Sequence, residues 1–139
     1  MTNDHQLHTM MLSGRAPRRQ TEGSVSRMIR LISLLPRRSD LTHEEFLDYW
    51  RNVHATIVAG NPAARFVQRY EQHAAAWPAD GKNEPPYDGV TIQEFASVAD
   101  FWAHNADPNA HLIMNDTANF LDMANLKWIL TEEPVVVIG

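Results

Sequence analysis

The sequence predicts one α+β domain in which strands and helices follow the order β-α-β-β-α-β. Three observations predict this order: an early apolar run, a helix with clear start and stop signals, and three later strand-like stretches. The same order defines the ferredoxin-like split unit, in which helices cover one face of an antiparallel sheet. A length of 139 residues suits one such domain with one main core.

The first strand is expected at residues 28–35, where a nearly continuous apolar run stops at Pro36. The first helix follows it, because Thr42 and Glu45 form a T-x-x-E capping box. Apolar residues at helical spacing predict its buried stripe, namely Phe46, Trp50, Val53 and Ile57. The sequence Gly60-Asn61-Pro62 is expected to end the helix.

The second and third strands are expected at residues 64–73 and at about 87–95. Between them, residues 74–86 contain three prolines and one glycine and are expected to form a loop.

The second helical region is expected to begin after the capping residue Ser97 and to break at Asp107-Pro108. A further helical piece follows the break. The last strand is expected at about residues 127–138, on an edge or at a bulge, because Pro134 cannot donate a ladder hydrogen bond.

Residues 1–26 differ from the rest, because they are polar, contain three arginines and show no apolar period. They are expected to form a disordered or extended tail, followed by the folded domain at 27–139. Two interpretations stay open for the tail: a functional extension, or a chain start placed too early, with the domain beginning at Met28.

Composition excludes several classes of function. The chain has no cysteine, so disulfides, thiolate nucleophiles and thiolate metal sites are excluded. A net charge of −5 argues against nucleic-acid binding, and no apolar run approaches the ~20 residues of a membrane span. Nucleotide-binding and serine-hydrolase motifs are missing, and the seven histidines lack zinc-site spacing. We therefore expect a cytoplasmic protein that has no cofactor, no metal, no membrane and no nucleic-acid partner.

His54 is the main candidate for chemistry. It follows Trp50 by four residues, which places it at the edge of the buried stripe, where a ligand pocket could form between helix and sheet. A histidine with a pKa near 6.5 can take and return a proton at neutral pH. The other interpretation is a histidine at the edge of the core that only hydrogen-bonds a backbone carbonyl.

Two other polar residues are secondary catalytic candidates. His73 closes the second predicted strand and could reach the mouth of the same pocket, or lie in solvent. Asp88 could orient a histidine, although Asp88-Gly89 also suits a turn. Aromatic residues are the candidates for substrate-binding walls or for core packing, namely Trp50, Tyr70, Phe101 and Trp102.

Residues 41–54, LTHEEFLDYWRNVH, resemble the opening helix of the EthD family. In that family a basic, proline-containing lead-in precedes E-E-F, Y-W and a following histidine, and the lead-in here is Pro36-Arg37-Arg38. The resemblance spans roughly residues 28–138 and includes three further segments, at 69–73, 87–90 and 119–122.

The resemblance implies a homodimer that forms a dimeric α/β barrel, with a pocket between each sheet and its helices. It matches His54 to the family's pocket histidine and places Tyr70, His73 and Asp88 at neighbouring matched positions. The long N-terminal tail and the proline-rich 74–86 loop depart from the family pattern.

The expected function is that of a cofactor-free lyase or isomerase of the decarboxylase, dehydratase or cyclase type. Its substrate would be a small, apolar, aromatic or polyketide-like compound, and His54 would be its proton shuttle. Two alternatives stay open: an auxiliary protein that binds a pathway compound without turning it over, and a cofactor-free monooxygenase. Fold membership does not choose among these chemistries.

Overall fold

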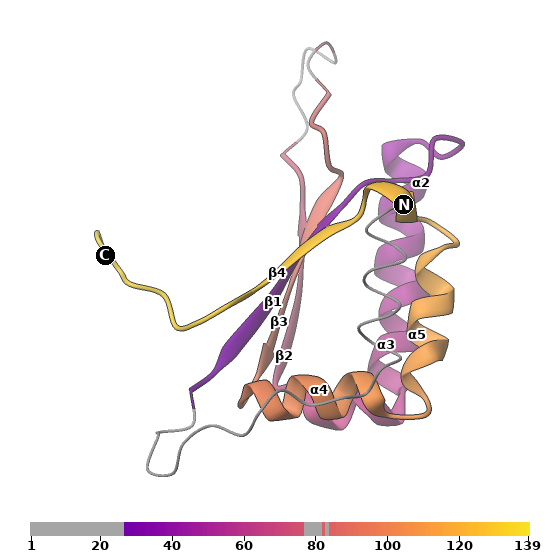
Figure 1. Ribbon diagram of the computed structural model, residues 1–139. Helices are drawn as coiled ribbons and strands as arrows, with labels where there is room; N and C mark the ends of the chain where they lie inside the picture. The colour runs from indigo at the N-terminus through magenta and orange to yellow at the C-terminus, as the bar shows by residue number, and fades with distance from the viewer. Residues whose placement is uncertain (1–26, 77–81, 83) are drawn as a thin grey trace.

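Four antiparallel strands form one sheet, and the helices all cover the same face of it (Figure 1). The computed structural model describes residues 27–76, 82 and 84–139, so the expected tail at 1–26 lies outside the described residues. The sheet order is β2-β3-β1-β4, which confirms the ferredoxin-like α+β fold. The strand bounds are β1 Ile29–Leu35, β2 Arg69–Ala74, β3 Gly89–Phe95 and β4 Lys127–Thr131.

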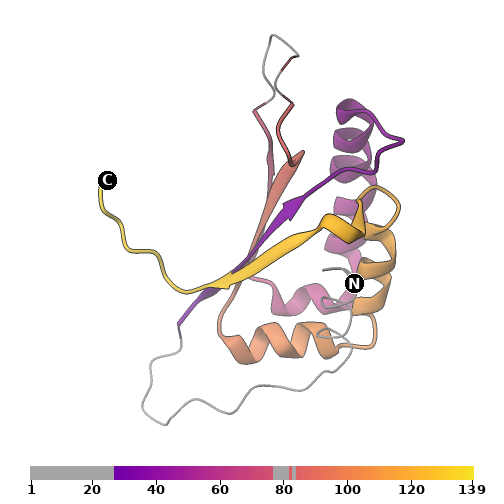
Figure 2. The same ribbon diagram turned by 45° about the horizontal axis from the view of Figure 1, so that its top comes forward.

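Two helical segments, one from each half of the chain, lie side by side in a single layer on the sheet (Figure 2). The first consists of α2, a π-helical segment η1, α3 and a 3₁₀ turn η2, with bounds His43–Tyr49, Trp50–His54, Ala55–Gly60 and Pro62–Phe66. The second consists of α4, α5 and a 3₁₀ turn η3, with bounds Val98–Ala106, Ala110–Thr117 and Met123–Asn125. None of the described helices is long and apolar enough to cross a membrane.

The capping box at the start of α2 is present as predicted. Thr42 Oγ1 accepts a hydrogen bond from the Glu45 backbone N–H at 3.1 Å, and the Glu45 carboxylate accepts one from the Thr42 N–H at 2.8 Å. Ser97 caps α4 in the same way, accepting from the backbone N–H of Asp100 at 3.1 Å. These local bonds satisfy N–H groups that have no partner within the helix.

The predicted buried stripe of the first helix is wrong after Trp50. The Val53 side chain is 41% exposed, while His54 and Val58 are buried. The reason is the π segment, where the Ala55 N–H donates to the carbonyl of Trp50, five residues earlier. The wider turn rotates the residues that follow, so that the buried face continues from Trp50 to His54 and Val58.

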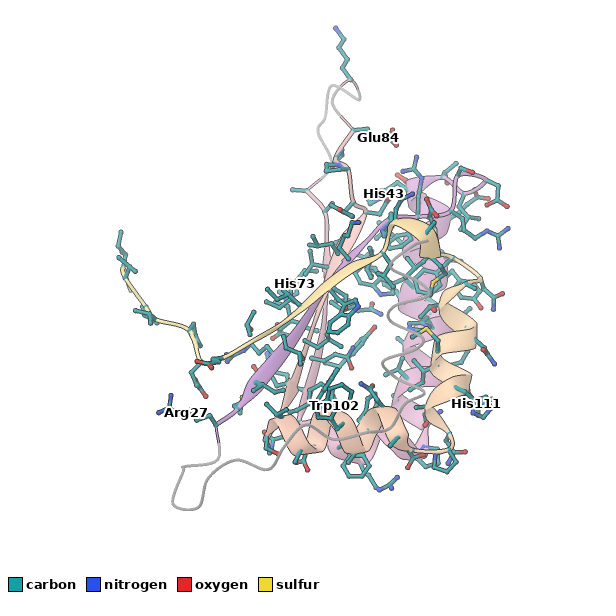
Figure 3. The ribbon with its side chains drawn as sticks, in the orientation of Figure 1. Arg27, His43, His73, Glu84, Trp102 and His111 are labelled. Carbon is teal, nitrogen blue, oxygen red and sulfur yellow. The ribbon has the colours of Figure 1, made fainter. Side chains whose placement is uncertain are left out.

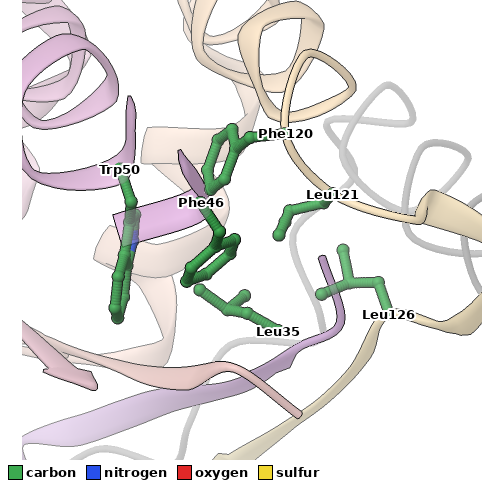
Figure 4. Close-up of a cluster of buried hydrophobic side chains, with 6 residues drawn as sticks. All are labelled: Leu35, Phe46, Trp50, Phe120, Leu121 and Leu126. Carbon is green, nitrogen blue, oxygen red and sulfur yellow. The ribbon is translucent and has the colours of Figure 1, made fainter. Parts of the chain in front are cut away.

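Large apolar side chains join the helices to the sheet in two clusters. The first contains the five aromatic and leucine side chains that surround Phe46, namely Leu35, Trp50, Phe120, Leu121 and Leu126 (Figure 4). The second lies at the other end of the sheet and contains Ile29, Leu31, Phe95 and Phe101. The two clusters flank the middle of the inner face, and this separation leaves room for a cavity between them.

Two predicted strand boundaries differ from the observed ones. The second strand begins at Arg69 instead of residue 64, because Asn61 caps a 3₁₀ turn at Pro62–Phe66 that occupies the expected start. The last strand ends at Thr131 instead of residue 138, before Pro134. The prediction that it is an edge strand is confirmed, since β4 pairs only with β1 among the described strands.

Candidate functional site

A cavity lies between the inner face of the sheet and the helices. Strands β1, β2 and β3 form its floor, and η1, α3, α4 and α5 form its walls. Most of the lining side chains are apolar, and the volume is about 90 Å³. A cavity that holds benzene measures roughly 150 Å³, so this space is smaller than a single aromatic ring requires, and an aromatic ligand would have to displace lining side chains.

The π segment places His54 in the wall of this cavity. His54 is only 4% exposed, and its ring lies against Phe120 with the ring centroids 4.8 Å apart. The observed position is therefore more central than the edge of the stripe that sequence spacing predicts. π-helical turns often occur at functional sites because they reorient one side chain without ending the helix.

A buried carboxylate holds the His54 ring. The distance from His54 Nδ1 to Asp116 Oδ2 is 2.7 Å, and Asp116 comes from α5. The other oxygen of Asp116 accepts hydrogen bonds from the Tyr49 hydroxyl at 2.6 Å and from Asn119 Nδ2 at 3.0 Å. Burial acts to raise the pKa of Asp116, but these hydrogen bonds outweigh it and hold the pKa below its usual value.

The pair therefore consists of an ionised Asp116 and a neutral His54 at neutral pH. Burial lowers the pKa of His54, and Asp116 opposes that shift only in part. Because the carboxylate can only accept, Nδ1 carries the hydrogen and Nε2 carries the lone pair. Among the residues that the structure describes, none forms a hydrogen bond with Nε2, so this atom is available to a ligand.

Two of the predicted aromatic residues, Trp50 and Tyr70, line the cavity beside His54. Gln72 Nε2 donates to the Trp50 carbonyl at 2.9 Å and lies 3.4 Å from the Tyr70 hydroxyl. Burial raises the pKa of Tyr70, and the nearby Gln72 and Trp50 side chains oppose that rise only in part. Tyr70 is therefore a neutral hydroxyl at the cavity floor.

The structure does not bring His73 or Asp88 to His54. His73 is exposed and hydrogen-bonds Glu71 at 2.8 Å, because alternation along β2 turns it away from the face that bears Tyr70 (Figure 3). Asp88 is buried but pairs with His43 Nδ1 at 2.8 Å and with Arg37 Nη1 at 3.2 Å. The expectation that one of them orients His54 is not met, since Asp116 occupies that position.

Phe101 and Trp102 do not line the cavity formed by the described residues. Phe101 is fully buried in the second core cluster, perpendicular to Phe95 with ring centroids 5.5 Å apart. Trp102 packs against Phe101 at 5.4 Å. Both are placed as packing residues, because helix α4 directs them toward the far end of the sheet.

Sequence reasoning did not identify two residues of the site. Asp116 holds His54, and Asn105 lines the cavity from α4. One signal for Asp116 was present. It lies three residues after Ile113 and four before Phe120, which puts a carboxylate on the apolar face of a helix. An ionisable group there requires a buried partner, and a histidine on a facing helix can supply one.

The sequence shows no spacing typical of metal ligands, and the described residues form no cluster of metal-ligating side chains. Within residues 27–76, 82 and 84–139, no group of three or more histidine, aspartate or glutamate side chains is arranged to hold a metal ion.

The sequence matches the EthD domain family over residues 38–124. No curated protein matches the chain in sequence.

Several solved structures share the fold at low sequence identity. An EthD family protein from Bacillus halodurans has a TM-score of 0.60 at 16% identity and covers 77% of this chain and 99% of its own. A hydroxynitrile lyase from Passiflora edulis has a TM-score of 0.56 at 14% identity. The match covers 82% of this chain and 100% of the lyase chain. A dimeric ferredoxin-like protein of unknown function from Thermobifida fusca has a TM-score of 0.57 at 17% identity. The match covers 84% of this chain and 100% of that protein.

Proposed function

The chain belongs to the EthD family, and we propose that it is a cofactor-free lyase or isomerase with His54 as its proton shuttle. The substrate is a compact, largely apolar compound, of the aromatic or polyketide-like kind, that enters the cavity beside His54. The observation that carries the proposal is the buried Asp116–His54 pair, whose free Nε2 belongs to a histidine in the cavity wall.

The geometry supports a simple division of roles. His54 Nε2 removes a proton from the bound compound and returns it at another atom or to a leaving group. Asp116 stabilises the imidazolium that forms and keeps the ring in one tautomer. General acid–base catalysis of this kind contributes roughly 10²–10⁴-fold in rate, and positioning in the cavity supplies the remainder.

The fold supports this class of reaction without specifying it. The hydroxynitrile lyase from Passiflora edulis has the same fold, so the fold can host a lyase. At 14% identity this likeness concerns the fold alone, and the chemistry must come from the residues of the site.

We also propose that the protein is a homodimer that pairs through the outer face of its sheet. That face carries apolar side chains that no described helix covers, including Ile32, Ile92 and Ile129. The arm after β4 adds four exposed apolar residues, Val135, Val136, Val137 and Ile138, and it leaves the sheet on the side away from the helices (Figure 1). The Thermobifida fusca protein of the same fold is dimeric, which supports this assembly.

A turnover screen tests the catalytic proposal. The native protein and the His54→Gln variant are incubated, without added cofactor, with hydroxylated aromatic acids, lactones and cyclic ketones, and the products are followed by mass spectrometry. His111→Gln is the matched control, because His111 is exposed on α5 and hydrogen-bonds only the Pro108 carbonyl among the described residues.

Conversion by the native protein and the control, but not by His54→Gln, supports the proposal. Equal conversion by all three proteins excludes His54 as the shuttle. Binding of compounds without any conversion favours the auxiliary binding protein, and oxygen uptake favours the monooxygenase.

A further inference from the structure

The cavity floor carries several polar side chains, although most of the wall side chains are apolar. Four side chains with oxygen or amide groups face the cavity from strands β1, β2 and β3, namely Ser33, Tyr70, Thr91 and Gln93. Strand register makes them one patch, because Ser33 pairs with Thr91 and Tyr70 pairs with Gln93 across neighbouring strands. Directly paired side chains have Cβ atoms about 4.5–5.5 Å apart, so one small molecule can contact several of them.

Three of these side chains on the cavity floor have donors and acceptors that the described residues do not use. Thr91 is buried, and no described residue hydrogen-bonds the side chains of Ser33, Thr91 or Gln93. A polar group kept without a partner in a buried position costs free energy unless a ligand or water completes it.

Asn105 adds an unpaired donor from the opposite wall. Its side chain is only 6% exposed and lines the cavity from α4, and its Nδ2 has no hydrogen-bond partner among the described residues. Leaving a buried donor unsatisfied costs free energy, and a ligand oxygen that reaches Nδ2 would recover it. The floor and this wall therefore present polar groups on two sides of the bound molecule.

The charges of the site decide which oxygen group fits. No lysine or arginine among the described residues lines the cavity, and the ionised Asp116 lies directly behind His54. A carboxylate ligand would have to lose its hydration without a cation to replace it. A neutral carbonyl or hydroxyl carries no such penalty.

We propose that the cavity is selective for a neutral, oxygenated compound, with a carbonyl oxygen that accepts from Asn105 and further polar atoms against Thr91 and Gln93. This inference rests on the proposed function, because it describes the ligand of the same cavity. It separates neutral ketones and hydroxyketones from hydrocarbons and from carboxylic acids, which are ionised at neutral pH.

Three probes of nearly the same shape test the inference: acetophenone, isopropylbenzene and benzoate. Their binding is measured by calorimetry and ligand-observed NMR at neutral pH. We expect acetophenone to bind at least about tenfold more tightly than either of the others, as the recovery of an unpaired buried donor predicts. Tighter binding of isopropylbenzene or benzoate, or no binding of acetophenone at millimolar concentration, would overturn the inference.

Two variants assign the selectivity to named residues. Asn105→Leu and Thr91→Val should each reduce the preference for acetophenone over isopropylbenzene several-fold. The matched controls are Asn115→Leu and Thr56→Val, whose parent residues are exposed and lie outside the cavity. An unchanged preference in both cavity variants, with the fold intact by circular dichroism, counts against the inference.

Measuring both turnover and binding preference in His54→Gln separates this inference from the catalytic proposal. His54→Gln should abolish turnover and retain the preference for acetophenone. Loss of the preference with turnover intact contradicts only the ligand class, whereas unchanged turnover in His54→Gln contradicts only the role of His54.

Discussion

His54 and Asp116 lie 62 residues apart in the chain and meet through a hydrogen bond of 2.7 Å between Nδ1 and Oδ2. One residue comes from the π segment η1 and the other from α5. Their contact depends on the packing of α5 beside η1, which Tyr49 reinforces by donating to the same carboxylate. The pair therefore links two helical segments by a hydrogen bond and places a polar side chain, His54, in the cavity wall.

The first prediction concerns the pKa of His54. In the native protein, burial lowers this pKa and Asp116 raises it in part, so Asp116→Asn should lower it further. The measurement is a histidine titration by NMR, in which the His54 resonance should shift at lower pH than in the native protein. Asp48→Asn is the control, because Asp48 is exposed and bonds Asn52. A higher His54 pKa in Asp116→Asn would contradict the pairing.

The second prediction concerns stability against acid. Burial lowers the pKa values of both His54 and His104, which bonds the Ala63 carbonyl at 2.8 Å. Because the folded pKa lies below the unfolded value of about 6.5, the unfolded chain binds more protons as the pH falls below about 7. The free energy of unfolding should therefore decrease from about pH 7 downward, until the folded pKa values are passed, by at most about 1.4 kcal/mol per pH unit for each proton.

Urea unfolding at a series of pH values measures this decrease. His104→Gln should reduce the slope in that range, because it removes one of the two groups. A slope that is the same in the variant, or stability that rises toward lower pH, is inconsistent with a neutral buried His104.

The third prediction concerns Gly89, which faces the ring of Trp50. A Cβ atom at this position would lie 2.6 Å from Trp50 Cη2 and 3.0 Å from the His73 carbonyl oxygen. The bulky ring and the backbone cannot both move away, so Gly89→Ala should cost about 1–3 kcal/mol of unfolding free energy. Gly60→Ala is the matched control, with nothing within 4 Å, and should be neutral or slightly stabilising. Urea midpoints of the two variants give the comparison, and equal midpoints would contradict the close packing.

The fourth prediction concerns Asp88, whose carboxylate holds His43 and Arg37. Asp88→Asn should lower the unfolding free energy by about 1–3 kcal/mol, since it leaves buried donors poorly paired. It should leave the His54 titration unchanged, because Asp88 does not contact His54. The control Asp40→Asn removes an exposed partner of Arg38 and should cost less than about 1 kcal/mol. A shifted His54 pKa in Asp88→Asn would show that Asp88 interacts with His54 and would contradict this prediction.

The fifth prediction concerns the proposed dimer. Ile129 is 59% exposed on the outer face of β4, so Ile129→Asp should weaken dimerisation and shift the protein toward monomer in analytical ultracentrifugation. Leu112→Asp is the control, because Leu112 is 49% exposed but lies on α5, in the helical layer. Equal effects of both changes, or none, would contradict pairing through the sheet face.

The sequence alone was sufficient to predict the fold class and most of its elements. Apolar runs, the Thr42 capping box and the break at Asp107-Pro108 are local signals, and the structure places strands and helices as they indicate. Local signals determine where an element begins, because backbone N–H groups at a helix start are satisfied by residues within the next turn. They failed at the π segment, where one extra residue in a turn changed which side chains are buried.

Only the tertiary structure decided what surrounds His54. The sequence singled out the histidine, but its carboxylate partner could have been any acidic residue, and the residues considered, His73 and Asp88, lie elsewhere. Asp116 and Asn105 reach the cavity through the packing of α4 and α5 on the sheet. Spacing along a chain specifies a face of one element, whereas the identity of the facing element depends on how all the elements pack together.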